Sequence, residues 1–484
     1  MRITSGYRVE IQKLHKPLAR TMKICRDAVD WLYPVIDGEW EALSRIRWEK
    51  QRFNAAEKLI HTTKRNRAEY AFDAAFPKMP SYLRRAVLQH VLGAVSSART
   101  RSAGSAEAGA SPKEPGICGL ISGKGPDGSV LSAETACVKA AVESGEPGEP
   151  SCGKGRKTEG TPGRNHYMPV FYKDNMYRKE EDRVFLKLYD GKDWVWQEVR
   201  LKKTDLDYIR KNWSGVKAKS PVLVKRHRKY FLQFAFEQEV ALTGKCAGMQ
   251  RICAVDLGIN TDAVCSIMEA DGTVAARKFI SFAAEKDRLW HVLNRVRKEQ
   301  RLHGPQSVRG FWAYARRLNE ELARKTAGAI VGFAKENRAD VIVFEHLDTG
   351  GKKIRGKNRQ KLHMWKKQSV QETAEHQAHR LGMRVSRVCA WKTSAYAYDG
   401  SGKVARDPKN HSLAVFPNGK QYNCDLSASY NIGARYFIRE LLKPVPETER
   451  SALEAKVPAV QRRTSCVYAD LRKLSAAMAE REAA

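Results

Sequence analysis

The sequence predicts a chain of mixed class, in which a helical part, an antiparallel β part and an α/β part follow one another. Three observations predict it. Residues 15–92 carry apolar side chains at helical spacing. Residues 183–236 contain short strand-like runs separated by turn or charged residues. Residues 252–388 place strands first and then alternate helix with strand.

The composition points to a polyanionic partner, because 87 Lys and Arg against 54 Asp and Glu leave a formal charge of +33. The 484 residues suffice for about three domains. No stretch approaches the roughly 18 to 20 apolar residues that a membrane helix needs, and the first residues lack the apolar core of a signal peptide. The ten cysteines are scattered. We therefore expect reduced thiols, no membrane contact and a cytoplasmic, nucleoid-associated protein.

The first half of the chain predicts three kinds of structure. Residues 5–11 alternate apolar and polar at period two, which indicates a strand. A basic helical domain follows, with its apolar stripe running from Leu32 to Ile46. Residues 101–165 contain no aromatic residue and are rich in Gly, Ser, Ala, Pro and Glu, so we expect a mobile insert there. The strand-like runs that come next predict a small barrel or sandwich, completed by the N-terminal strand.

The second half predicts an α/β section. A buried strand beginning at Ile252 ends in an acid and a glycine, and two further strands around the Asp271-Gly272 turn make a meander with it. The remaining elements are two basic helices, a second buried strand, another helix and a last strand, at residues 284–302, 308–337, 340–345, 363–381 and 384–388.

Three carboxylates in this section stand at the ends of elements. Asp256 closes the first buried strand, Glu345 closes the second, and Asp425 opens a helical run. Taken singly, each has an ordinary structural explanation, as a strand-end polar residue, a solvated loop residue and a helix N-cap. Taken together they suggest one acidic cleft. Converging acids repel one another and raise their pKa values unless divalent cations lie between them.

Mg²⁺ is the cation that suits such a cleft, because it prefers hard oxygen ligands and keeps several waters. Two ions about 3.5 to 4 Å apart are able to activate a water and stabilise the leaving oxygen in phosphodiester hydrolysis. The sequence therefore predicts a nuclease site with Asp256, Glu345 and Asp425 as magnesium ligands.

The flanks of these acids carry a specific resemblance. Ala254-Val-Asp-Leu-Gly-Ile-Asn, Val341-Ile-Val-Phe-Glu-His-Leu and Asp425-Leu-Ser-Ala-Ser-Tyr-Asn-Ile resemble the three motifs of the split RuvC nuclease of TnpB proteins and compact type V CRISPR effectors. The resemblance covers the whole chain except the aromatic-free insert. It implies an RNase H-like fold, a guide RNA, and cleavage of target DNA beside a short flanking motif. Asp256, Glu345 and Asp425 are then the catalytic metal ligands.

The resemblance also divides the chain. The expected parts are an N-terminal strand of a wedge-like β-barrel (1–14), a helical recognition domain (15–100), the low-complexity mobile insert (101–165), the wedge-like barrel (166–248), the nuclease domain with its first two motifs (249–388), a degenerate zinc-ribbon-like insert that loads the target (389–424), and the third motif with C-terminal helices (425–484).

One departure from the family concerns zinc. The family carries two C-x-x-C pairs between the second and third acids, whereas only Cys389 and Cys424 stand here, and a tetrahedral zinc site needs four ligands. We therefore expect no structural zinc and a target-contacting loop held by packing alone. Arg406 in this loop is a candidate for stabilising phosphate charge, although a solvated loop arginine is its simpler explanation.

A cationic segment follows Glu345 among glycines, and it fits binding to a nucleic-acid backbone. A run of charges is more often a solvated face, so its position after a candidate catalytic acid is what makes it informative. The candidate nucleic-acid-binding residues are Lys352, Lys353, Arg355, Lys357, Arg359, Lys361, Lys366 and Lys367.

The leading hypothesis is an RNA-guided, Mg²⁺-dependent DNA endonuclease with one RuvC-type site. The alternative is a guide-dependent DNA-binding protein, a repressor or transposition accessory factor, that does not cleave. An unguided transposase lacks a convincing tyrosine nucleophile, and no phosphate-binding loop supports an ATP-driven motor. A transposon-derived and a CRISPR-derived guide both stay open, as do a monomer and a homodimer.

Overall fold

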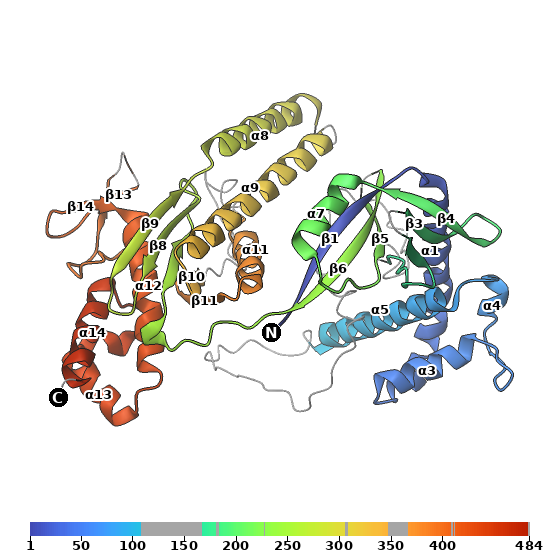
Figure 1. Ribbon diagram of the computed structural model, residues 1–484, viewed down its shortest axis with the longest axis horizontal. Helices are drawn as coiled ribbons and strands as arrows, with labels where there is room; N and C mark the ends of the chain where they lie inside the picture. The colour runs from blue at the N-terminus through green and yellow to red at the C-terminus, as the bar shows by residue number, and fades with distance from the viewer. Residues whose placement is uncertain are drawn as a thin grey trace. The chain divides into compact units, whose positions relative to one another are not determined.

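The computed structural model describes residues 1–107, 167–180, 183–226, 228–304, 308–346, 366–407, 410 and 412–482. The chain forms two compact units, one of residues 4–238 and one of residues 1–3 with 239–484 (Figure 1). Both units mix helices with sheets, as the sequence predicts. The division at residue 238 lies close to the expected boundary between the barrel and the nuclease part.

The sheet of the first unit is built around the N-terminal strand. Its six strands have the order β2-β3-β4-β1-β6-β5, so β1 lies between β4 and β6, although the described residues form five helices between β1 and β4 and six between β1 and β6. This confirms that the N-terminal strand completes the sheet. The described strands end at the edges β2 and β5, and closure into a barrel stays a prediction. The bounds are β1 Arg2–Gln12, β2 Tyr177–Glu180, β3 Arg183–Tyr189, β4 Trp194–Leu201, β5 Val222–Arg226 and β6 Lys229–Glu239.

The helices of this unit share one core with the sheet. Leu18 and Leu32 of α1 are fully buried together with Leu186 and Leu188 of β3. The helical part and the sheet, for which the sequence predicts two domains, share this core because the apolar stripe of α1 covers the apolar face of β3. The helices are α1 His15–Gly38, α2 Trp40–Ser44, α3 Glu49–Ile60, α4 Phe72–Ala75, α5 Ser81–Glu107 and α7 Lys203–Trp213.

Helix α5 ends at Glu107, so residues 101–107, expected to begin the mobile insert, continue a helix. Residues 108–165 of the expected insert lie outside the described residues.

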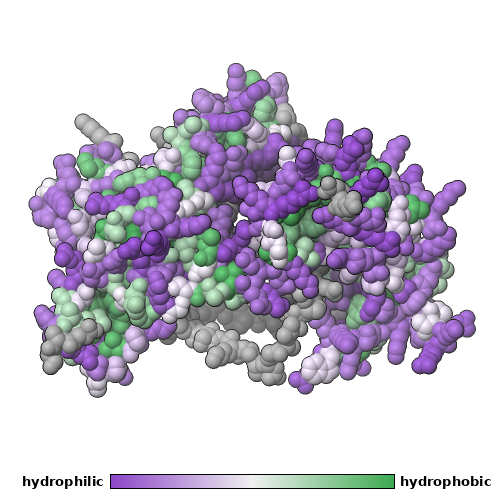
Figure 2. Space-filling view, viewed as in Figure 1, coloured by the Kyte–Doolittle hydropathy of each residue, from purple (hydrophilic) through white to green (hydrophobic). Residues whose placement is uncertain are grey.

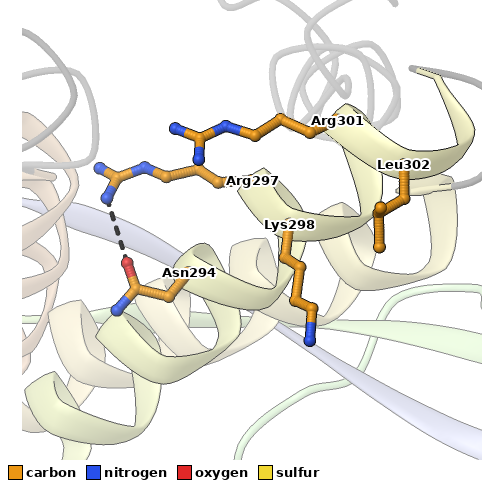
Figure 3. Close-up of a pocket in the computed structure, with 5 residues that line it drawn as sticks. All are labelled: Asn294, Arg297, Lys298, Arg301 and Leu302. Carbon is orange, nitrogen blue, oxygen red and sulfur yellow. Dashed lines mark hydrogen bonds between the residues drawn. The ribbon is translucent and has the colours of Figure 1, made fainter.

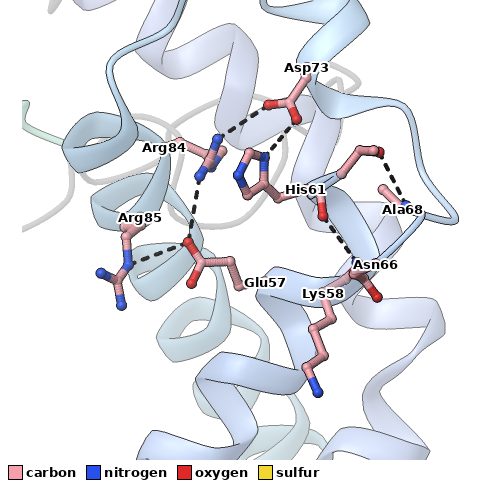
Figure 4. A network of polar contacts seen from close by, with 9 residues as sticks. Glu57, Lys58, His61, Asn66, Ala68, Asp73, Arg84 and Arg85 are labelled. Carbon is pink, nitrogen blue, oxygen red and sulfur yellow. Dashed lines mark hydrogen bonds and ion pairs between the residues drawn. The ribbon is translucent and has the colours of Figure 1, made fainter. Parts of the chain in front are cut away.

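A polar network joins α3, α4 and α5 (Figure 4). The guanidinium of Arg84, only 8 % exposed, contacts Asp73 at 3.3 Å and Glu57 at 3.7 Å. Asp73 also pairs with Nδ1 of His61 at 2.7 Å, and Arg85 contacts Glu57 at 3.4 Å. A buried cation requires such partners, so these contacts fix how the three helices pack.

The second unit is built on a five-stranded sheet of order β11-β10-β7-β8-β9. Strands β7, β8 and β9 are antiparallel, and β10 and β11 run parallel to β7 and to each other. The predicted meander followed by alternating helix and strand is therefore confirmed. The bounds are β7 Ile252–Asp256, β8 Ala263–Met268, β9 Val274–Ile280, β10 Val341–His346 and β11 Arg384–Cys389.

Helices cover both faces of this sheet (Figure 1). Cys253 and Val255 of β7 share a core with residues of α9 and α11, whereas Ile252 and Ala254 share a core with residues of α12, α13 and α14. The alternation of side chains along a strand therefore assigns each position of β7 to one face. The helices are α8 Ala283–His303, α9 Arg309–Glu336, α11 Lys367–Arg380, α12 Cys424–Leu442, α13 Glu447–Lys456 and α14 Tyr468–Glu482.

Residues 389–424, expected as a zinc-ribbon-like insert, contain a small antiparallel sheet of order β12-β13-β14. Its core joins Ala397, Ala414 and Phe416 to Cys424, and Tyr398 and Tyr422 pack against them. The strands are β12 Ala405–Arg406, β13 Leu413–Val415 and β14 Gln421–Asn423.

Candidate active site

The register of the parallel strands brings the first two acids together. Val255 of β7 lies opposite Phe344 of β10, and the next residues of the two strands are Asp256 and Glu345. Neighbouring strands lie about 4.8 Å apart, so both carboxylates leave the same end of the sheet. Ala254 of β7 and Val343 of β10 pack on the face that α12 covers. Because side chains alternate along a strand, Asp256 and Glu345, each two residues further on, point to the same face. Asp256 and Glu345 therefore lie on the face that α12 covers.

A tight turn follows Asp256 and requires glycine. A Cβ atom on Gly258 would stand 2.5 Å from the carbonyl oxygen of Thr261. Any larger residue would open this turn. The glycine of the first motif thus keeps the end of β7 fixed, and with it the position of Asp256.

Asp425 comes from the first turn of α12. The N-cap of this helix is Asn423, whose side chain accepts a hydrogen bond from the Leu426 backbone N–H at 2.9 Å. Capping therefore does not account for Asp425. Helix α12 approaches the sheet closely at Gly433, where a Cβ atom would lie 2.9 Å from Sδ of Met268. This close approach holds the middle of α12 against β7 and β8, since Ala254 of β7 also lies 3.3 Å from the same Cβ position.

The three acids influence one another electrostatically. Burial raises the pKa of Asp256 well above its usual range, and the charges of Glu345 and Asp425 raise it further. Burial also raises the pKa of Glu345 and of Asp425. Three carboxylates with raised pKa values in one place attract a cation, because a cation removes both their repulsion and the cost of burying their charges.

Three neighbouring side chains favour the ionised form of the Glu345 carboxyl group. The hydroxyl of Thr393 donates a hydrogen bond to Oε1 of Glu345, and this bond lowers the pKa of the carboxyl group. The nearby charges of Arg435 and Lys367 lower its pKa as well. Gln371 donates to the Glu345 carbonyl oxygen at 2.9 Å. Glu345, 8 % exposed, is therefore the most firmly held of the three acids.

Helix α12 also holds the loop that carries Thr393. Asn431 donates to the carbonyl oxygens of Thr393 and Tyr396 at 2.9 and 3.0 Å. Arg435 donates to those of Cys389 and Trp391 at 2.7 and 2.9 Å. One helix thus supplies Asp425 and positions the loop that contacts Glu345.

Arg406 lies near the acids. Its guanidinium lowers the pKa of both Asp256 and Asp425, and its Nη2 atom donates to the Ser394 hydroxyl at 3.0 Å. The side chain is exposed. An exposed cation beside three acids is well placed to meet a phosphate group.

Two of the expected nucleic-acid-binding residues are described. Lys366 is half-buried just before α11. Lys367 is only 7 % exposed, and its charge acts on Glu345, so little of it is accessible to a phosphate. Lys352, Lys353, Arg355, Lys357, Arg359 and Lys361 lie outside the described residues.

The three acids suit a hard divalent cation, because such cations prefer oxygen ligands and all three side chains are carboxylates. They also come from one end of the sheet and from the adjacent helix. As they stand, however, no group of three or more His, Cys, Asp or Glu side chains among the described residues is arranged to hold a metal ion. Oε1 of Glu345 is occupied by the Thr393 hydroxyl in this arrangement. The Mg²⁺ site therefore remains a proposal.

Comparisons with known proteins find a partial family match and distant structural likenesses. A family model described as the Aq_aa04 family matches residues 4–118, which do not include the three acids. No curated protein matches the chain.

The solved structures to which this chain is similar include complexes of Cas12 and C2c1 proteins. CasPhi-2 (Cas12j) bound to crRNA and phosphorothioate-DNA is 11 % identical over 88 % of this chain and 90 % of that chain, with a TM-score of 0.44. The Cas12f1–sgRNA–target DNA complex is 12 % identical over 89 % and 98 %, with a TM-score of 0.30. Alicyclobacillus acidoterrestris C2c1 with single-guide RNA is 11 % identical over 54 % of each chain, with a TM-score of 0.36.

At these identities, function has to be argued from the chain's own residues. The solved neighbours are complexes with guide RNA, and two of the three also contain DNA. Among the described residues, no helix of the chain combines the length and apolar character needed to cross a membrane.

Helix α8 carries a basic face whose residues were not predicted from the sequence as binding residues. A hollow on this helix is lined by Asn294, Arg297, Lys298, Arg301 and Leu302, and Arg297 donates to Asn294 at 3.1 Å (Figure 3). On the face shown in Figure 2, hydrophilic residues predominate on α8, with apolar residues between them. Because residues four apart share a helix face, the spacing of Arg297 and Arg301 was the signal that could have found this surface.

Proposed function

We propose that the chain is an RNA-guided DNA endonuclease that hydrolyses phosphodiester bonds with Mg²⁺ at Asp256, Glu345 and Asp425. One observation carries this proposal. Glu345 and Asp425, which follow Asp256 by 89 and 169 residues in the sequence, lie close enough for their charges to raise its pKa beyond the effect of its burial. A domain with only a structural role gains nothing from gathering like charges in this way.

The topology supports a RuvC-type, RNase H-like assignment for the second unit. Numbered along the unit, its strands run 5-4-1-2-3 across the sheet, with an antiparallel meander followed by two parallel strands. Asp256 and Glu345 end the two adjacent central strands, and Asp425 lies on the helix packed beside them. This is the arrangement that the three motifs resembling RuvC imply.

The residues divide the chemical work among them. Asp256, Glu345 and Asp425 would hold Mg²⁺, which when bound supplies an activated water and stabilises the leaving oxygen. Thr393 orients the Glu345 carboxylate by its hydrogen bond. Arg406, exposed beside Asp256 and Asp425, would bind the phosphate and stabilise the charge that develops on it.

Guide RNA and target DNA are the partners that the motif resemblance implies for this chain. The formal charge of +33 supports a polyanionic partner. In such a complex the guide supplies sequence recognition by base pairing, and the protein holds the backbone and reads a short flanking motif.

One observation favours the alternative, a guide-dependent DNA-binding protein that does not cleave. The three acids, as they stand, do not form a group able to hold a metal ion among the described residues. Binding of a nucleic acid and Mg²⁺ would have to draw the acids together for cleavage.

A cleavage experiment separates these functions. The full chain is purified with the RNA that accompanies it, this RNA is sequenced, and labelled DNA matching the RNA is incubated with protein and Mg²⁺. We expect Mg²⁺-dependent cleavage, its loss in Asp256→Ala, and unchanged RNA-dependent DNA binding by that variant. Binding without cleavage by the wild type would establish the alternative, and loss of binding in Asp256→Ala would contradict the assignment of this residue to chemistry.

A further inference from the structure

An exposed tryptophan lies two residues before Thr393, which contacts Glu345 of the candidate active site. Trp391 follows β11 and exposes 51 % of its surface. The ammonium group of Lys392 lies 4.2 Å from the centre of its ring. An exposed indole ring with a cation beside it offers a flat apolar face to a ligand.

The backbone under this side chain is held firmly. Arg435, almost completely buried, donates to the Trp391 carbonyl oxygen at 2.9 Å and to that of Cys389 at 2.7 Å. Lys392 has a φ of 55°, a left-handed conformation that is costly for a residue with a Cβ atom. Such a conformation persists only where the surroundings enforce it, and it clusters at functional sites. Trp391 is therefore an exposed ring on a rigid turn.

The turn leads directly into the acid site. Thr393, two residues after Trp391, donates to Glu345, and Ser394 accepts a hydrogen bond from Arg406. The rim of the site therefore combines one exposed ring with two exposed cations, Lys392 and Arg406. Aromatic rings interleaved with cations are the usual surface for an unpaired nucleic-acid strand, in which bases stack and phosphates pair with charges.

We propose that Trp391 is a stacking platform for one base of single-stranded nucleic acid at the candidate active site, with Lys392 beside an adjoining phosphate. The proposal rests on the proposed function only for what happens to the strand afterwards, because stacking requires no cleavage. A base in a duplex has its faces covered by its neighbours, so the ligand is an unpaired strand. The charged side chains around the ring favour this strand over an apolar protein partner.

The test measures binding of two fluorescent oligonucleotides to the full chain by anisotropy. One is oligo(dT), and the other has the same length and phosphates but abasic sugars. Moderate salt suppresses binding that depends on phosphates alone. The chains compared are the wild type, Trp391→Ala, Trp391→Phe and Phe279→Ala. Phe279 is a matched control, because it is 50 % exposed on β9, at the opposite edge of the sheet from β11.

We expect Trp391→Ala to weaken oligo(dT) binding about 5- to 100-fold, the range for loss of one base–aromatic stack. Trp391→Phe should retain most of the wild-type affinity for oligo(dT), and Phe279→Ala should change this affinity little. On the abasic strand, Trp391→Ala should bind like the wild type. Equal binding of oligo(dT) by the wild type and Trp391→Ala, or an equal loss on both strands, would overturn the platform. Cleavage by the wild type is measured separately. If the wild type does not cleave DNA, the binding measurements still decide whether Trp391 stacks on a base.

Discussion

Ionisation of the Asp256 carboxyl group destabilises the folded protein when no cation is bound. Burial and its two acidic neighbours raise its pKa, so ionisation at pH 7 costs folding free energy. The folded state is thus favoured as pH falls towards and below the ordinary carboxyl range, and this contribution is lost as pH rises through the raised pKa.

We therefore expect Asp256→Asn to raise the melting temperature of the protein in EDTA at pH 7, by about 2 °C or more for each 1 kcal/mol gained. The advantage should shrink as the pH falls below 7, because the raised pKa favours the protonated form of the wild-type carboxyl group in the folded state. Thermal unfolding at pH 7 and pH 5 measures it. Glu336→Gln, at an exposed acid on α9, should show no such change. A wild type that is as stable as Asp256→Asn at pH 7 would mean that the three acids do not repel one another.

Thr393 is a positioning residue in this account, because it acts through Glu345. Thr393→Val keeps the shape of the side chain and removes its hydroxyl group. We expect this variant to lower the cleavage rate or raise the Mg²⁺ concentration needed for half-maximal cleavage about 10- to 100-fold. Thr393→Ser, which retains the hydroxyl group, should recover most of the loss. If valine and serine at this position behave alike, the hydrogen bond has no part in positioning Glu345.

At the residue scale, the sequence revealed the acids but not their surroundings. Asp256, Glu345 and Asp425 each follow or begin a recognisable element. The Thr393 hydroxyl reaches Glu345 from 48 residues away, a separation that no local pattern reports. Lys367 was expected to face nucleic acid, yet it is buried, because the helix α11 that begins with it turns it toward Glu345.

At the element scale, the sheet β12-β13-β14 lies in residues 389–424, for which the sequence suggested a degenerate zinc-ribbon-like insert. Its aromatic residues pack closely, with Tyr398 5.0 Å from Tyr422 and 5.7 Å from Phe416 between ring centres. Lys420 donates to the Tyr398 hydroxyl at 2.6 Å. The sequence predicted that packing holds this part. It did not predict the sheet, since strands of two or three residues leave no periodicity to read.

We expect chelators to leave this element intact. Treatment with EDTA and a zinc chelator should change the melting temperature by less than about 1 °C, whereas Phe416→Ala should cost about 3 to 5 kcal/mol locally. Thermal unfolding with elemental analysis of the purified protein measures the first, and denaturant unfolding measures the second. One zinc per chain, with unfolding on chelation, would contradict a metal-free element.

At the scale of the whole molecule, long-range pairing was easier to predict than packing. The period-two pattern of β1 predicted that this strand completes the sheet, but not that it lies between β4 and β6. The common core of α1 and β3 did not follow, because an apolar stripe shows that a face is buried but not what covers it. The close approach of α12 to the sheet at Gly433 was not predicted either, because the sequence pattern of a helix does not identify its packing partner.

The charge of the molecule predicts salt-dependent binding of nucleic acids. Replacing Arg297 and Arg301 on α8 with alanine should reduce the slope of log K against log salt by about 0.9 for each phosphate that the variant no longer neutralises. Titrations of double-stranded DNA at several salt concentrations measure this slope. Lys335→Ala, at the end of α9, is the control. An unchanged slope in the α8 variant would exclude this face from the nucleic-acid interface.

The proposed nuclease mechanism requires Asp256, Glu345 and Asp425 to share a divalent cation. Electron paramagnetic resonance of Mn²⁺, titrated into the nucleic-acid-bound full chain, detects this cation. We expect a bound Mn²⁺ signal whose affinity falls at least about tenfold in each of Asp256→Asn, Glu345→Gln and Asp425→Asn, and stays unchanged in Glu336→Gln. Single variants that all bind Mn²⁺ as tightly as the wild type would contradict this mechanism.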